Sequence, residues 1–319
     1  MLRGAPTPAY RQAGAALPLF FLRARLCVRF RERFYYSEKF ERMERTNNMG
    51  PLSHTLVSTK VTGRKNSLLI LGSLLPDIAW SSTIKEWRYK LHENSKVFYD
   101  YIKENYPQLL ELAIGVRLHS YEDRGADYYS DDEKVGFAKI EAHKISNDVT
   151  KLLGLESNGL TVPFKYGLRV NSSSWIGKML GINKKIAFVI AHNFIEGGVD
   201  LNLLEKNKDL VAIYKRTFDN LDLNEIVASL SQYLGVKEET LEEEIEKYIK
   251  LIKPNNFSSI NTIATETVLP LLENRLERKL DSEEVVKVLK KAKEITQQNY
   301  LIFLNKAINQ MQQDFKEII

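Results

Sequence analysis

The sequence predicts an all-α protein of many helices, and two observations lead to that prediction. Apolar residues recur at helical spacing in most segments after residue 48, so each segment has one apolar face. The chain has 319 residues, 44% of them hydrophobic, which is enough for a sizeable core. It contains no glycine-rich phosphate loop, no Gly-x-Ser-x-Gly elbow and no internal repeat. Any chemistry therefore has to come from side chains on helices.

The first 48 residues differ in composition from the rest. They hold nine Arg and one Lys against four Glu, whereas the remainder holds 36 basic and 37 acidic residues. The apolar run at 15–22 is short and is followed by arginines, unlike a secretory signal, while the lack of acids before Glu32 is closer to a transit peptide. We expect residues 1–48 to be a disordered leader or a false start, with Met49 as the preferred natural start.

The chain shows no sign of a disulfide framework or a membrane span. It has one cysteine, Cys27, and no run approaches the ~20 apolar residues that a transmembrane helix needs. These observations predict a globular protein, and without a convincing secretory signal we expect it in the cytoplasm.

The first candidate helix, after Met49, carries His54. At helical spacing His54 shares a face with Val57 and Val61, so its imidazole should point inward. Such a histidine could be a metal ligand, or a core residue bonded to a backbone carbonyl.

A second candidate site residue, Asp77, follows the apolar string at 68–76 directly after Pro76. Proline fits the first turn of a helix, where a carboxylate is also favoured, so one interpretation is a simple helix start. The apolar surroundings of Asp77 favour a functional role instead. His92 then follows on a helix with an apolar face and by itself indicates little.

The stretch at 109–123 ends an apolar helical face in two polar residues. His119 and Asp123 are one turn apart on that face, and burial of an ionised carboxylate is unfavourable unless a cation or hydrogen bonds compensate it. The pair could hold a metal. It could also be a surface pair at a helix end, because Arg124 and Gly125 follow at once.

Two later segments carry further candidates. We expect 135–153 to form one helix flanked by His143, and 154–174 to form either a long loop or a short hairpin around Val162 and Phe164. The helix at 184–200 carries His192 and Glu196 one turn apart on an apolar face and ends or bends at Gly197 and Gly198. This is a second His-x-x-x-acid pair. The acidic segment at 125–133 is interpreted as a solvated loop.

The order of these residues resembles that of the zinc-dependent phospholipase C family. The string at 71–78, Leu-Gly-Ser-Leu-Leu-Pro-Asp-Ile, is similar to the family's Gly-small-apolar-Pro-Asp signature. The intervals from Asp77 to His92 and from His119 to His143 are also similar. The resemblance covers about residues 49–148, or 49–200 at its widest. Residues 206–319 lie outside it, and we expect them to form a C-terminal helical extension packed on a domain at 49–205.

The resemblance implies an all-α domain with a cluster of one to three zinc ions. By analogy, Asp77, His92, His119 and Asp123 would hold one ion, and His54 a neighbouring ion that Asp123 bridges. His143 would belong to a further ion. The implied reaction is phosphodiester hydrolysis of a phospholipid, releasing diacylglycerol and a phosphorylated head group. Clustered zinc ions lower the pKa of a water and polarise phosphoryl oxygens, and Asp77 is the candidate to orient or deprotonate that water.

The chain departs from the family pattern in three places. The family uses its N-terminal amine as a ligand, whereas a leader or Met49 precedes His54 here. The family has a histidine where this chain has only Asp127 and two tyrosines, and it has an acid one turn after the last histidine, where Asn147 stands. We therefore expect His192 and Glu196 to complete the site at His143.

Three classes of function follow from the sequence. The first is a zinc-dependent phosphoric diester hydrolase acting on a phospholipid, with peripheral membrane contact, or on another phosphodiester. The second is an all-α binding or scaffold protein with a partial, noncatalytic metal site. The third is a metal-dependent hydrolase of another bond, or a related nuclease or phosphatase. Basic residues are not interleaved with aromatics, so no nucleic-acid signature is present.

Overall fold

The computed structural model describes residues 50–319, apart from 81, 133, 158–160, 164–168, 176–177, 179–180, 220 and 277. The predicted leader at 1–48 and Met49 lie outside the described residues. Within the described part of the chain, no helix combines the length and hydropathy that a bilayer crossing requires.

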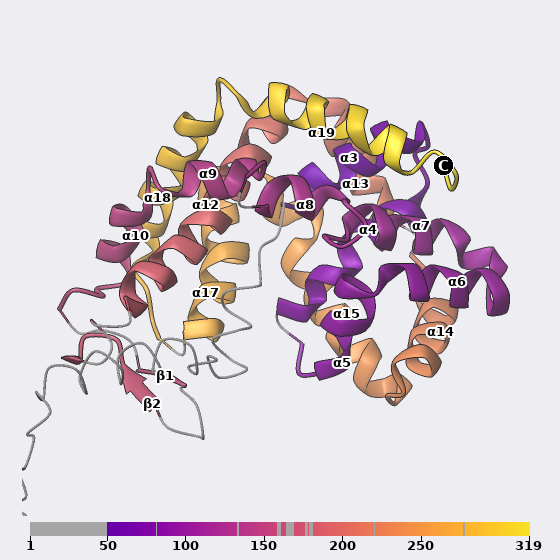
Figure 1. The fold of residues 1–319 in the computed structure, drawn as a ribbon, viewed down its shortest axis with the longest axis horizontal. Helices are drawn as coiled ribbons and strands as arrows, with labels where there is room; N and C mark the ends of the chain where they lie inside the picture. Colours follow the sequence, from indigo (N-terminus) through magenta and orange to yellow (C-terminus); the bar gives the residue numbers. More distant parts are fainter. Residues whose placement is uncertain are drawn as a thin grey trace, which may run out of the picture.

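The protein is all-α, as predicted, apart from one short hairpin (Figure 1). The first half of the described chain contains α3 (Pro51–Thr62), α4 (Ser67–Leu74), η1 (Leu75–Trp80), α5 (Lys85–Trp87), η2 (Arg88–Glu93), α6 (Ser95–Asn105), η3 (Pro107–Leu109), α7 (Leu110–His119), α8 (Ala126–Asp131), α9 (Phe137–Ala142) and α10 (Ser146–Leu152). The hairpin pairs β1 (Thr161–Pro163) with β2 (Arg169–Asn171) in antiparallel register. The second half contains α12 (Ile182–Lys206), α13 (Lys208–Asp219), α14 (Asn224–Leu234), α15 (Glu238–Ile252), η5 (Pro254–Phe257), α16 (Ile260–Ile263), η6 (Ala264–Val268), α17 (Leu269–Leu276), α18 (Ser282–Thr296) and α19 (Tyr300–Asp314).

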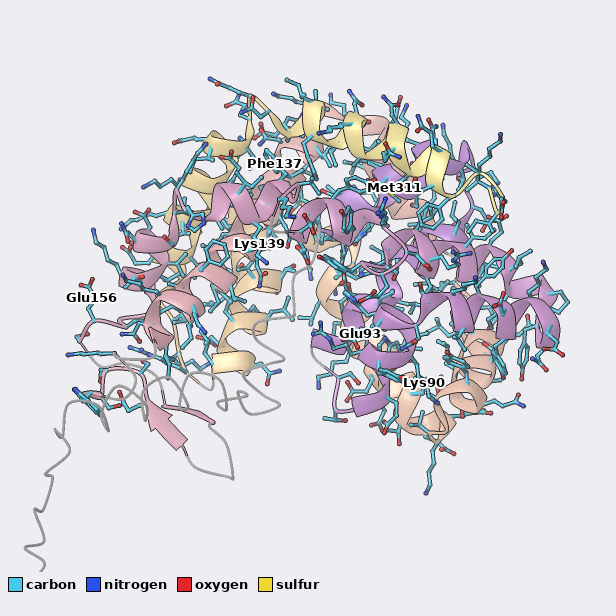
Figure 2. The ribbon with its side chains drawn as sticks, viewed as in Figure 1. Lys90, Glu93, Phe137, Lys139, Glu156 and Met311 are labelled. Atoms are coloured by element: carbon cyan, nitrogen blue, oxygen red, sulfur yellow. The ribbon has the colours of Figure 1, made fainter. Side chains whose placement is uncertain are left out.

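The C-terminal helices pack on the N-terminal ones around one continuous core. The buried apolar cluster runs from Leu52 to Phe315. Helix α18 lies along α12, α13 contacts α3 and α4, and α19 contacts α3 along the top of the view in Figure 1. Phe137 of α9, labelled in Figure 2, stacks on Phe303 of α19 with ring centroids 4.8 Å apart. Lys90 of η2, also labelled there, donates to the carbonyl of Tyr233 at 2.6 Å and so ties η2 to α14.

The structure differs from two sequence-based expectations about helix ends. Of the two alternatives for Gly197 and Gly198, a helix end is wrong, because α12 continues to Lys206. A Cβ at Gly198 would lie 2.6 Å from the backbone of Ala292, so this glycine allows α18 to approach closely. The expected single helix at 135–153 is instead two helices, because the chain turns at 143–145 between α9 and α10. The hairpin alternative for 154–174 is confirmed at Val162, whereas Phe164 lies outside the described residues.

Two glycines set the distance between α4 and α7, which carry the chain into Asp77 and His119. A Cβ at Gly72 would lie 2.0 Å from the carbonyl oxygen of Leu112, and one at Gly115 would lie 2.1 Å from that of Leu69. The two backbones are therefore in direct contact at the crossing. Only glycine permits this approach, so the crossing determines how close His119 comes to η1.

We expect Gly115→Ala to lower the free energy of unfolding by about 1–3 kcal/mol, because the added methyl group overpacks the crossing. It should also weaken metal binding by moving His119 away from Asp77. Denaturant unfolding and metal analysis measure the two effects. Gly197→Ala is the matched control, since its Cβ would meet only the flexible end of Leu289, at 3.1 Å. Equal stability of the two variants would contradict the prediction.

Helix α3 is held in place by Asp200, which comes from α12. The Asp200 carboxylate accepts hydrogen bonds from the backbone amides of Leu52 and Ser53, both at 2.9 Å, and from the Ser53 hydroxyl at 2.6 Å. These amides belong to the first turn of α3, where no intrahelical partner exists. Asp200 thus caps α3 from another helix and positions His54 one turn further on.

Asp200 also makes stability depend on pH. Burial raises its pKa to about 6, although the hydrogen bonds from Ser53 and Leu52 act in the opposite direction. Because the folded-state pKa lies above the unfolded value, the contribution of Asp200 to stability is complete at low pH and is lost as the pH rises through about 6.

We expect the free energy of unfolding of the wild type, minus that of Asp200→Asn, to fall by on the order of 2–3 kcal/mol between pH 4 and pH 7. Urea unfolding at the two pH values measures this difference. Asp100→Asn, at an exposed position on α6, is the control and should show no such change. A difference that stays constant or grows with pH would rule the assignment out.

Candidate metal centre

Buried histidines and carboxylates meet in two groups where α3, η1, η2, α7, α8 and α12 converge. We call the larger one the central group; it consists of His54, Asp77, His92, His119 and Asp127. The smaller one, the second group, consists of Asp131, His192 and Glu196. All eight side chains are buried, with exposed fractions of 8% or less. Burial of this many ionisable groups is unfavourable unless a cation or protons neutralise the carboxylates.

His119 is the centre of the first group, and a backbone contact sets its tautomer. Its Nδ1 lies 2.9 Å from the carbonyl oxygen of Ser73, which can only accept, so Nδ1 carries the proton. In the neutral ring the lone pair is then on Nε2, which lies 3.4 Å from Asp77 and 3.2 Å from Asp127. A lone pair that faces two carboxylates requires a proton or a metal ion between them.

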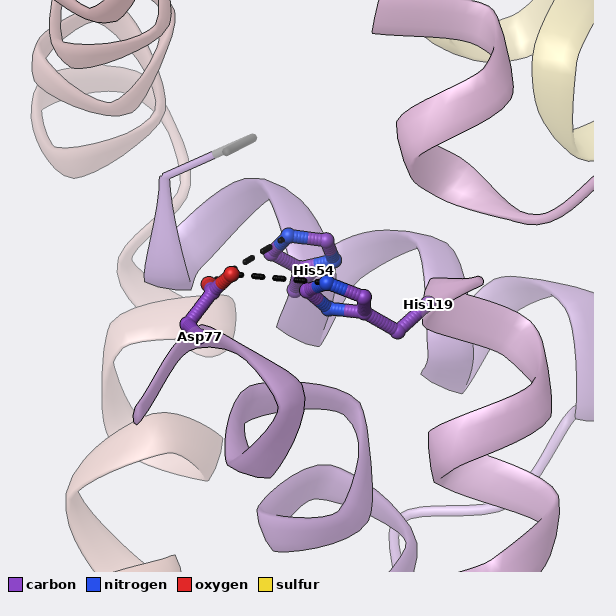
Figure 3. Close-up of side chains that lie close together, drawn as sticks. All are labelled: His54, Asp77 and His119. Carbon is purple, nitrogen blue, oxygen red and sulfur yellow. Dashed lines mark ion pairs between the residues drawn. The ribbon is translucent and has the colours of Figure 1, made fainter. Parts of the chain in front are cut away.

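His54 faces the same two carboxylates from α3. Its Nε2 lies 3.7 Å from Asp77 Oδ2 and 3.5 Å from Asp127 Oδ1, and its ring stacks on that of His119 at 4.2 Å. Figure 3 shows Asp77 pointing at both rings. In tetrahedral zinc sites, bonds of ~2.0–2.1 Å place neighbouring ligand atoms roughly 3.3 Å apart. The contacts of His54 and His119 with the carboxylates, at 3.2–3.7 Å, are therefore close to the spacing expected between ligands of a common ion.

The unmade hydrogen bonds point to the same conclusion. Asp77 Oδ1 is buried and makes no hydrogen bond, and the polar neighbours of the buried His119 Nε2 and Asp127 oxygens are ring nitrogens or carboxylate oxygens of the same group. Buried polar atoms normally have a partner, so an orphan group calls for an explanation. These donor atoms also belong to the residue types that zinc prefers.

The electrostatics show what the central group needs when no cation is present. Burial raises the pKa of Asp77 well above its usual value, despite the opposing charge of His119. Burial likewise raises the pKa of Asp127, but His119 and His92 more than offset this effect and hold it below its usual value. Burial lowers the pKa of His119, yet the charges of Asp127 and Asp77 raise it to about 9. At neutral pH the group must therefore take up protons, which one divalent cation would replace.

His92 approaches Asp127 from the π-helical segment η2. Its Nε2 lies 2.8 Å from Asp127 Oδ2, and its ring meets that of His119 edge-on with centroids 5.0 Å apart. Asp127 therefore directs one oxygen at His54 and the other at His92 and His119. That is the arrangement of a carboxylate that bridges two positions.

The second group repeats this chemistry on α8 and α12. His192 Nε2 lies between Asp131 Oδ1, at 2.6 Å, and Glu196 Oε1, at 2.9 Å. The Ser130 hydroxyl donates to Glu196 at 2.5 Å. Burial raises the pKa of Glu196 to about 8, although His192 acts in the opposite direction. Burial lowers the pKa of His192, but Glu196 and Asp131 raise it to about 10.

One short helix links the two groups. Asp127 and Asp131 are four residues apart in α8, so both carboxylates emerge on one face of the helix. Asp127 reaches the central group and Asp131 the second. Residues 125–133 were expected to form a solvated loop, so neither aspartate was predicted to be a ligand; that expectation is wrong, because residues 126–131 form α8. The i, i+4 spacing of Asp127 and Asp131 is the sequence feature that could have indicated a shared helix face.

Six of the eight residues predicted for the site lie in these groups: His54, Asp77, His92, His119, His192 and Glu196. Asp123 does not, which corrects its assignment as a bridging ligand. Helix α7 ends at His119, and the chain reverses at Arg124, whose φ is 58°. Asp123 is consequently turned away, accepting from Ser95 at 2.6 Å and pairing with Arg117 at 3.0 Å.

His143 is the second correction. It lies at the turn after α9, exposed, with its ring against that of Phe188 at 4.6 Å between centroids. It belongs to neither group. His192 and Glu196 are therefore completed by Asp131 and not by His143.

Comparison with known proteins adds no assignment. A scan against protein-family models, a search of curated proteins and a search of solved structures each returned no match.

Proposed function

We propose that the protein is a metal-dependent phosphodiester hydrolase, similar in chemistry to zinc-dependent phospholipases C. The observation that carries the proposal is the pair of adjacent His/carboxylate groups joined by α8, with a buried Asp77 oxygen that makes no hydrogen bond. The order of His54, Asp77, His92 and His119 in the chain, which resembles that family, supports it independently.

The donor atoms fit zinc better than a hard cation, because imidazoles make up half of them. In the central group an ion could be held by His54, Asp77 and His119, or by His92, His119 and Asp127. Another would be held by Asp131, His192 and Glu196. When bound, such ions supply polarisation of the phosphoryl oxygens and a lowered pKa for a nearby water.

The protein's own residues have separable roles in this proposal. Asp77 borders a cavity beside the central group and is the candidate to orient the attacking water or accept its proton. Asp127 contacts His54, His92 and His119 and would fix the positions of their rings. The Ser73 carbonyl keeps the lone pair of His119 on Nε2. The phosphodiester would bind between Asp77 and Glu196, which both line the cavity.

The alternative is a structural, noncatalytic metal site, and the burial of the ligands favours it. Structural sites are closed, whereas catalytic sites keep an open position. His119 and Asp127 are fully buried. The positions of Asp77 and Glu196 favour catalysis. Asp77 of the central group and Glu196 of the second group both line a cavity, so each group has one candidate ligand that a substrate could reach.

The test is metal analysis of the purified full chain combined with turnover of bis(p-nitrophenyl) phosphate. We expect bound zinc, turnover that a chelator removes and zinc restores, and loss of both properties in His119→Ala. His143→Ala is the matched control, because this histidine lies outside both groups, and it should retain metal and activity. Bound zinc without turnover would favour the structural site, and absence of zinc would overturn both functions.

A further inference from the structure

A partly open cavity is lined both by members of the metal-ligand groups and by the C-terminal helices. Its volume is about 140 Å³. Most of its lining is apolar and comes from the region that the phospholipase resemblance does not cover. These side chains include Ile252 of α15, Phe257 of η5, Ile263 of α16 and Leu272 of α17, all of them buried.

Polar side chains line the cavity as well. Asp77 of the central group and Glu196 of the second group both line it. Asn193, one turn before Gly197 on α12, lines it as well, and its buried Oδ1 makes no hydrogen bond. A ligand that fills the cavity thus meets apolar side chains together with metal ligands and a free acceptor.

The size of the cavity restricts the ligand. An apolar cavity of about 150 Å³ accommodates a benzene molecule. A long acyl chain has several times that volume. The fitting group therefore has roughly six carbons, the size of a phenyl ring or a short branched alkyl chain.

We infer that this cavity binds a compact apolar group, of phenyl size, on the phosphodiester that the metal centre hydrolyses. The inference rests on the proposed function for the position of the phosphate. It assigns a specificity-determining role to the C-terminal helices, and it disfavours a diacyl phospholipid as the substrate.

The test compares two anions that differ only in the apolar group, phenylphosphonate and methylphosphonate. Titration calorimetry on the zinc-loaded full chain should give a dissociation constant at least ~10-fold lower for phenylphosphonate. Leu272→Phe, which fills the cavity, should abolish that preference without changing methylphosphonate binding. Leu276→Phe is the control, because Leu276 lies one turn on in α17 and outside the lining. Equal affinities in the wild type, or a preference that survives Leu272→Phe, would overturn the inference.

A second measurement needs neither a variant nor catalysis. Fluorobenzene should bind the wild-type protein with or without zinc, as followed by fluorine NMR, and phenylphosphonate should displace it whereas methylphosphonate should not. Failure of fluorobenzene to bind would also overturn the inference. Phenyl preference without diester turnover would overturn the hydrolase proposal alone, and turnover without phenyl preference would overturn the cavity assignment alone.

Discussion

Replacing Asp127 with asparagine should cause the largest loss of metal and activity of any single change. One oxygen of Asp127 faces His54 and the other faces His92 and His119. Asparagine keeps the shape but replaces one acceptor oxygen with a donor and removes the charge. Even indirect partners of metal ligands change affinity by about 10–100-fold, so a direct bridging ligand should exceed that range. We expect zinc content to fall by at least one ion and diester turnover to fall by more than about 100-fold.

Asp123→Asn is the matched control for this prediction. It makes the same chemical change four residues earlier, at a partly exposed carboxylate that pairs with Arg117. Asp123 also accepts a hydrogen bond from Ser95 and belongs to neither metal-ligand group. Zinc content and turnover should therefore stay at wild-type levels. If Asp123→Asn loses metal while Asp127→Asn retains it, the chain reversal at Arg124 is incorrectly assigned and the sequence-based ligand set is right.

Asp77→Asn should separate a metal ligand from a residue that only starts a helix. A capping residue would cost about 0.5–2 kcal/mol of stability whether or not metal is present. For a ligand, turnover should fall by orders of magnitude, roughly 100-fold or more. Inductively coupled plasma analysis and the chromogenic diester assay measure zinc and turnover, and thermal melting of chelator-treated protein measures the apo stability.

For the metal-free protein, the direction of the change in stability on Asp77→Asn can also be predicted. Burial raises the pKa of Asp77, so its ionised form is disfavoured in the folded state, and the stability it contributes at low pH is lost as the pH rises. Metal-free Asp77→Asn should therefore be at least as stable as the metal-free wild type at pH 7, and increasingly so at higher pH. A less stable apo variant with normal zinc content and turnover would make Asp77 a helix-start residue and remove its proposed roles as a metal ligand and water-orienting group.

The chain reversal at Arg124 explains why one carboxylate was assigned wrongly from the sequence. The prediction placed His119 and Asp123 on one continuous helix. The helix ends at His119, and the Gly125 amide donates to the Ser120 carbonyl at 2.6 Å. A Cβ at Gly125 would lie 2.5 Å from the Leu118 carbonyl. This tight return brings the next helix, α8, back over the site, and Asp127 takes the place that Asp123 was expected to fill.

The close helix crossings at glycines were also not predictable from the sequence. Gly72 and Gly115 lie within otherwise apolar helices and permit the backbone contact between α4 and α7. Likewise Gly198 lets α18 approach α12. A glycine's local signal is the same whether it ends a helix or lets another helix approach. Only the position of the partner backbone distinguishes the two.

The sequence by itself predicted the all-α class and the helix faces on which His54, His119, His192 and Glu196 lie, because apolar periodicity and i, i+4 spacing are local properties of the chain. The tertiary structure decided which carboxylates complete the metal groups, and that the C-terminal helices form the cavity beside them. These outcomes depend on one reversed turn, on backbone contacts at glycines and on contacts between residues more than 100 positions apart, such as the hydrogen bond from the Leu52 amide to Asp200. Contacts of that kind have no signature in the spacing of residues along the chain.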